Sequence, residues 1–185
     1  MSADQLLSIV RHYWPSSNEH YLKGDASPEI ERLHALWQQE LKKLDKWWEF
    51  LSELERELPG FTIGDATATL NASFRCVAYS GRTAPHRFAV VGCLSILAPV
   101  FTVYGLEFED AEATRRVSRM RFEPLPAEMQ EPARVMARKM EAAFGAHALP
   151  REVAETPVPL FVEWRAPPET TLFHALFASK PERVP

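Results

Sequence analysis

The chain has 185 residues, of which 46% are hydrophobic and 25% are charged, so it can bury one sizeable core and does not have the composition of a disordered protein. Its formal net charge is −4. This balance disfavours non-specific binding to nucleic acid, which needs a basic face to displace counterions. We therefore expect a single domain over residues 1–185 and no nucleic-acid partner.

The sequence predicts neither export nor insertion into a membrane. Asp4 comes early, the apolar run around it is short, and no small-residue cleavage site follows, so a signal peptide is not expected. The uncharged stretch 88–104 is shorter than the about 20 residues of a spanning helix, and Pro99 interrupts it. We expect a cytoplasmic protein without membrane contact.

A long amphipathic helix is expected after a short helix or strand at residues 6–10. Ser27 is a suitable N-cap and Pro28 suits the first helical position, while Pro59 ends the element. Spacings of three and four place the apolar residues on one stripe. These residues are Ile30, Leu33, Trp37, Leu41, Leu44, Trp48, Leu51, Leu54 and Leu58. The helix would hold about 30 residues, with a break near Trp47 as an alternative.

From residue 61 the pattern changes to that of strands. β-Branched residues, partial alternation and short connections, including a turn at residues 80–83, predict an antiparallel meander. The expected strands lie at 67–79, 87–97, 100–108 and, as an edge strand, 117–122.

A second helix is expected at residues 127–144, with Pro132 in its first turn or at a kink and Gly145 closing it. Residues 158–164 predict one more strand, with prolines at its entry. Thr170 is a candidate cap for a short helix through residue 177, although a strand fits that segment equally well. The fold class is therefore α+β: an antiparallel β-sheet packed against a long N-terminal helix and a second helix in the C-terminal half.

Motifs for catalysis, metals and cofactors are missing from the sequence. It has no glycine-rich phosphate loop, no CxxC and no two histidines at ligand spacing, so we expect no metal and no cofactor. Cys93 with His86 is a conceivable thiolate pair, but Cys93 lies in the most apolar run, so a packed, reduced thiol is favoured for it and for Cys76. A disulfide between neighbouring strands is the less favoured alternative. We do not expect an enzyme.

Exposed carboxylates and tryptophans instead suggest a surface for a basic partner. The side chains of Trp47 and Trp48 point about 100° apart, so both can be buried only if other elements cover a wide arc of the helix. We slightly favour burial of both over the alternative in which one is an exposed anchor for a partner. The candidate partner-binding residues are Trp48, Glu49, Glu53, Asp65, Glu107, Glu109 and Asp110. Each of these carboxylates, taken by itself, is more simply explained as part of a solvated helix face or loop. A basic patch, formed by Arg115, Arg116, Arg119 and Arg121, departs from a simple mimic of nucleic acid.

Three segments together resemble a known family. They are the helix with Trp37, Trp47 and Trp48, the turn LPGFTIGD at residues 58–65, and the end PVPLFVEW at 157–164 followed by PPETTLF at 167–173. In these features the chain is similar to immunity protein family 52, which is paired with restriction-endonuclease-like toxins of polymorphic or type VI secretion systems. The resemblance implies a cytoplasmic inhibitor that binds a cognate nuclease toxin and blocks its active site or substrate groove.

Two other functions stay open. One is a small-molecule-binding domain or enzyme whose site forms only on folding, which predicts a deep polar pocket on the sheet with His86 or Cys93 facing it. The other is a structural subunit of a secretion or phage-defence assembly.

Overall fold

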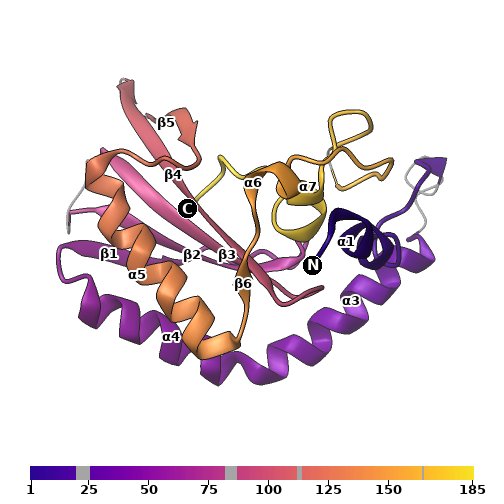
Figure 1. Cartoon of the computed structure of the whole chain (residues 1–185), viewed down its shortest axis with the longest axis horizontal. Coiled ribbons are helices and arrows are strands. Elements are labelled where there is room, and N and C mark those ends of the chain that lie inside the picture. The colour runs from indigo at the N-terminus through magenta and orange to yellow at the C-terminus, as the bar shows by residue number, and fades with distance from the viewer. Residues whose placement is uncertain (20–25, 82–86, 112–113, 164) are drawn as a thin grey trace.

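The structure, a computed structural model, describes residues 1–19, 26–81, 87–111, 114–163 and 165–185. Its centre is the expected antiparallel meander, in the order β1-β2-β3-β4-β5, with a short β6 parallel to β4 (Figure 1). The strands are β1 (Phe61–Asp65), β2 (Ser73–Ser80), β3 (Phe88–Ser95), β4 (Val100–Ala111), β5 (Thr114–Arg121) and β6 (His147–Ala148).

Helices cover both faces of this sheet, which gives the α+β fold that the sequence predicts. The helical segments are α1 (Ala3–Val10), α3 (Pro28–Glu40), the 3-10 turn η1 (Leu41–Lys43), α4 (Leu44–Glu57), α5 (Ala127–Phe144), α6 (Arg151–Ala154) and α7 (Leu172–Leu176). Among the described residues, no helix has both the length and the apolarity that crossing a membrane requires.

Helix α5 lies close over the middle of the sheet because glycine occupies the strand positions beneath it. A Cβ added at Gly92 of β3 would lie 2.7 Å from Cε of Met140, and one at Gly105 of β4 would clash with Met129. Strand β3 is buried along its whole length, with α5 on this face. The thioethers of α5 thus fill the space that side chains on the strands would otherwise take.

The opposite face is covered by α7 and the C-terminal segment. Ser73 Oγ donates a hydrogen bond of 2.9 Å to the carbonyl of Phe177, and Tyr104 Oη donates one of 2.9 Å to the carbonyl of Pro181. The Tyr104 ring also meets Phe173 edge to face. Helix α1 packs against α7, and Trp14 Nε1 donates to the carbonyl of Ala175.

The single long helix expected from residue 27 is wrong: the chain forms α3 and α4, joined by η1. Lys43 leaves the helical region, with φ −108° and ψ 18°. In a straight helix Trp37 and Trp47 would be separated by about 15 Å along the axis. With the bend, both rings lie 5.1 Å from the ring of Phe74. Aromatic packing onto β2 therefore outweighs the regular stripe of apolar residues.

The second expected helix and the expected helix cap at Ser27 are present in the structure. The 127–144 helix is confirmed, and Gly145 closes it in the left-handed conformation at φ 63°. Ser27 caps α3 by accepting from the N–H of Ile30. The undecided segment near the C-terminus is helical, with Thr171 rather than Thr170 as its N-cap.

The strand expected at 158–164 is wrong, because that segment makes only isolated bridges, Pro157 with Thr171 and Val162 with Arg165. Pro157 and Pro159 have no N–H to continue a ladder, and Phe161 donates its N–H to Pro15 instead. Residue 164 lies outside the described residues, as do positions 82 and 83 of the expected turn.

The aromatic cluster between α4, α5 and β2 predicts a stability effect. Phe50 is 1% exposed, stacks on Trp47 and meets Phe144 edge to face. Phe50→Ala should lower the free energy of unfolding by about 3–5 kcal/mol, because a ring-sized cavity forms in a packed core. Leu70→Ala, at a side chain 60% exposed, is the control and should change it by less than about 0.5 kcal/mol. Urea unfolding measures both, and equal values would contradict the assignment of this core.

Candidate functional site

Trp48 is on the outward face of α4. It is 49% exposed, whereas its neighbour Trp47 is 1% exposed and donates from Nε1 to Asp65 at 3.2 Å. The expectation that both rings are buried is therefore wrong. The inner side of α4 packs on β1, β2 and α5, so one of two side chains that point about 100° apart remains in solvent.

The carboxylates around Trp48 divide into two groups. Glu53 and Glu57 form ion pairs with Lys139 of α5, at 2.7 and 2.8 Å. The hydrogen bond from Lys139 lowers the pKa of each of these carboxyls. Each step of four residues turns about 40° around a helix, so Glu49 lies about 80° from Glu57, and it forms no ion pair with a described residue. Of the expected partner-binding residues, Glu53 is thus engaged within the chain.

The outward face of α4 also carries acids without an internal partner. Asp45, Glu49 and Glu55 are exposed, and none of them forms an ion pair with any residue that the structure describes. Asp45, Ser52 and Glu55 lie on the same side of the helix as Trp48, and Glu49 lies about 100° around the helix from it. We call Asp45, Trp48, Glu49, Ser52 and Glu55 the α4 face.

Asp65, another expected partner-binding residue, holds the end of β1 in place. Its Oδ1 accepts from Trp47 Nε1, from the N–H of Thr67 at 3.1 Å and from Thr67 Oγ1 at 2.6 Å. One carboxylate oxygen therefore joins α4 to the segment between β1 and β2. Asp65 positions the helix that carries Trp48.

The acidic cluster expected at the end of β4 lies opposite the arginine patch. The cross-strand register pairs Glu107 with Arg119, Glu109 with Arg116 and Asp110 with Arg115. Glu107 also accepts from Arg121 Nε at 2.9 Å. The two clusters that look separate in the sequence therefore share one hairpin of mixed charge. Glu109 is exposed, and the side chain of Asp110 lies outside the described part of the chain.

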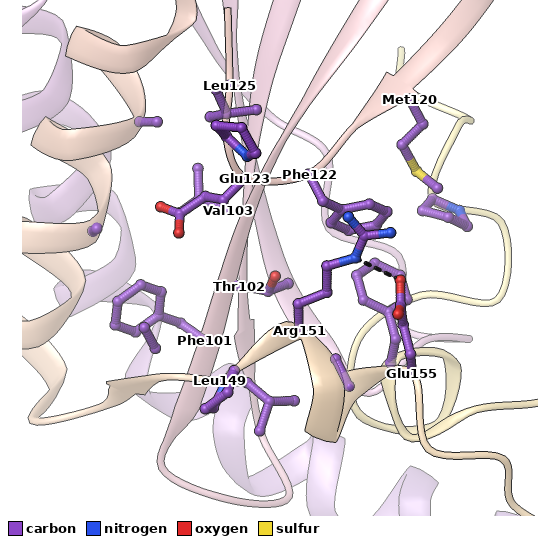
Figure 2. A pocket seen from close by; sticks show the side chains of 18 of the residues that line it. Phe101, Thr102, Val103, Met120, Phe122, Glu123, Leu125, Leu149, Arg151 and Glu155 are labelled. Carbon is purple, nitrogen blue, oxygen red and sulfur yellow. Dashed lines mark hydrogen bonds and ion pairs between the residues drawn. The ribbon is translucent and has the colours of Figure 1, made fainter.

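A groove of about 1180 Å³ lies along the edge of β4, between α5 on one side and α6 and α7 on the other (Figure 2). Phe101, Val103 and Phe122 contribute to its floor, and Leu125 and Leu149 to its walls. The sequence analysis did not find this groove, because residues from both faces of the sheet and from three helices line it.

The sheet ladder is interrupted in this groove. Strand β5 pairs with β4 only from Gly105 onward, and β6 pairs only with Val100 and Phe101. The carbonyl of Phe101 accepts from the N–H of Leu149 at 2.8 Å, so its peptide groups point away from β3. Peptide groups alternate in direction along a strand, which aims the N–H and C=O of Val103 the same way, into the groove. Neither has a hydrogen-bond partner outside the strands among the described residues.

Charged side chains form the rim of the groove, and its arginines are all paired. Arg151 bonds to Glu155 at 2.7 Å and lies over the Phe122 ring. The other pairs are Arg134 with Glu131 and Arg138 with Glu57. Glu123 and Glu141 line the groove without an ion pair to any described residue. The lining therefore holds three arginines and three glutamates, and Glu123 and Glu141 are the two of these glutamates without an ion pair to a described residue.

His174 of α7 lines the same groove as a neutral donor. Its Nδ1 accepts from the N–H of Thr171 at 3.1 Å, which places the proton of the neutral ring on Nε2. Burial, aided by the charge of Arg165, lowers the pKa of His174 to about 4.

Cys93, the expected alternative nucleophile, is outside the groove. Cys76 and Cys93 are fully buried and free, on opposite faces of the sheet. Burial raises the pKa of both thiols, that of Cys93 to about 11. His86 lies outside the described residues. Within the chain that the structure describes, no group of histidine, cysteine and acidic side chains is arranged to hold a metal ion.

The lowered pKa of His174 predicts how stability varies with pH. The unfolded chain takes up a proton near pH 6.5, while the folded chain does so only near pH 4. This contribution to stability is therefore complete above pH 6.5 and is lost as the pH falls toward 4. His174→Gln should flatten the dependence of the unfolding free energy on pH between these values. An NMR titration that gives His174 a pKa near 6.5 would contradict the burial argument.

No family model, no curated protein and no solved structure matches this chain. None of these comparisons links the chain to immunity protein family 52.

Proposed function

We propose that this protein is a cytoplasmic immunity protein that binds and neutralises a cognate nuclease toxin of a bacterial secretion system. The observation that supports this most is the α4 face, where a half-exposed tryptophan stands near carboxylates that have no ion-pair partner among the described residues. Exposed tryptophans are enriched at the centres of protein interfaces. A nuclease offers the complementary chemistry, because its substrate groove is basic.

The α4 face is held rigidly, which favours tight binding. Trp47 and Phe50 anchor the inner side of α4 in the aromatic cluster, and the ion pairs of Lys139 tie the helix to α5. Trp48 is therefore presented from a fixed backbone, so less conformational entropy is lost when a partner binds.

The charges of the α4 face would act mainly on the rate at which the partner associates. Asp45, Glu49 and Glu55 are exposed, so salt screens them, and they contribute to the rate of association more than to the final affinity. Trp48 would supply the larger part of the binding energy. Because the net charge is only −4, shape and the aromatic anchor share the task with electrostatics.

Trp48→Ala tests this proposal. Co-expressed with a nuclease toxin encoded beside this chain, the variant should lose protection, and its affinity for the inactivated toxin should fall at least about 30-fold, as for an interface hot spot. Its unfolding free energy should change by less than about 0.5 kcal/mol, because the ring is half exposed.

Leu70→Ala removes another exposed apolar side chain and serves as the matched control; it should protect like the unmodified chain. If Trp48→Ala keeps both protection and affinity, the α4 face is not the toxin-binding surface. If cells survive the toxin equally well without this chain, the proposed function is wrong.

A second candidate function, a ligand-binding domain whose site forms on folding, is favoured by the groove along β4. The groove brings together residues from β4, α5, α6 and α7, but its lining is mainly apolar, whereas that hypothesis expects a polar pocket. It does not contain Cys93, so the version with a cysteine nucleophile has no support from its geometry.

A further inference from the structure

We propose that the groove along β4 binds a short extended segment of a basic partner protein, pairing its backbone with Val103. The segment brings at least one apolar and one cationic side chain. This site is separate from the α4 face, so it does not depend on the proposed toxin-binding surface.

The first argument comes from the main chain of β4. The N–H and C=O of Val103 point into the groove, and β5 and β6 occupy the same edge above and below it. An unpaired strand edge is a template for another backbone. One peptide unit of a bound segment can donate to the carbonyl of Val103 and accept from its N–H. The flanking strands limit this pairing to about one residue, so the segment crosses the edge rather than extending the sheet.

The second argument is the apolar surface beside that edge. Phe101, Leu125 and Leu149 line the groove next to Val103, and Phe122 lies beneath the guanidinium of Arg151. Side chains alternate along an extended segment, so one that pairs with Val103 can place an apolar side chain against these residues. The groove has a volume of about 1180 Å³, which gives room for such a side chain.

The third argument is charge. Each of the three lining arginines already has a carboxylate partner, while Glu123 and Glu141 have none among the described residues. Figure 2 shows the Glu123 carboxylate pointing toward α5, the helix that carries Glu141. A lysine or arginine of the bound segment could pair with either of these acids, whereas an acidic segment would have to compete with the glutamates that already pair with the arginines.

NMR titration of the ¹⁵N-labelled full chain tests the proposal. The probe is the peptide acetyl-Lys-Val-Lys-Leu-amide, and we expect saturable shifts at the amides of Val103 and Phe122. The same peptide with Glu in place of both Lys should bind at least tenfold more weakly. A version N-methylated at its central residues should also bind at least tenfold more weakly, because it cannot donate to the carbonyl of Val103.

Matched variants test the role of charge. The double variant Glu123→Gln and Glu141→Gln should weaken binding of the basic peptide about tenfold. The control pair, Glu128→Gln and Glu152→Gln, removes equal charge from exposed positions outside the groove and should leave binding unchanged. Trp48→Ala should also leave it unchanged, which separates this site from the proposed toxin-binding face.

Four results would overturn the proposal. The first three are the absence of saturable shifts at Val103 with millimolar basic peptide, equal binding of the acidic peptide, and equal binding of the N-methylated peptide. A fourth is tighter binding of phenethylamine, which has one ring and one cation but no peptide bond; this would assign the groove to a small molecule.

Discussion

Strand β3 is buried along its whole length, and the rest of the molecule is arranged to keep it so. Strands β2 and β4 pair with its edges, while helices and the C-terminal segment must cover both faces. Apolar strands of this kind are stable only where both faces are shielded from water. Most of the helical surface therefore packs against the sheet. Among the described residues, the α4 face and the open edge of β4 remain as candidate surfaces for a partner.

The bend between α3 and α4 links the core to the first of these surfaces. Trp37 and Trp47 both pack on Phe74, which fixes the rotation of α4 about its axis. With Trp47 turned inward and bonded to Asp65, Trp48 must point outward. The same rotation turns Glu57 toward Lys139, while Glu49 has no ion pair with any residue in the described part of the chain. One packing arrangement thus decides which tryptophan and which carboxylates a partner can meet.

Sequence patterns predicted the elements whose signals are local. The helix at 127–144, its closing Gly145 and the cap at Ser27 follow from periodicity and capping chemistry, and the meander follows from short connections. The bend at residues 41–43 results from tertiary contacts with Phe74; the sequence offered a break only as an alternative, and a few residues later, near Trp47. The segment at 158–164 has apolar residues typical of a strand, but Pro157 and Pro159 lack the N–H groups that a ladder needs.

The site was less predictable than the fold. Exposure of Trp48 was considered but not favoured, and the pairing of Glu53 with α5 and of the β4 acids with β5 needs the packed structure. Nothing in the sequence around Val103 indicates an unpaired peptide group, because the gap depends on where β5 and β6 end. Glu123 and Glu141 stand out only once the arginines beside them are seen to be paired.

Amide hydrogen exchange of the full chain measures the open edge of β4 most directly. The N–H groups of Thr102 and Tyr104 point to β3 and should be strongly protected, whereas that of Val103 should exchange at least about a hundredfold faster. Protection of Val103 equal to that of its two neighbours would mean that the edge is closed.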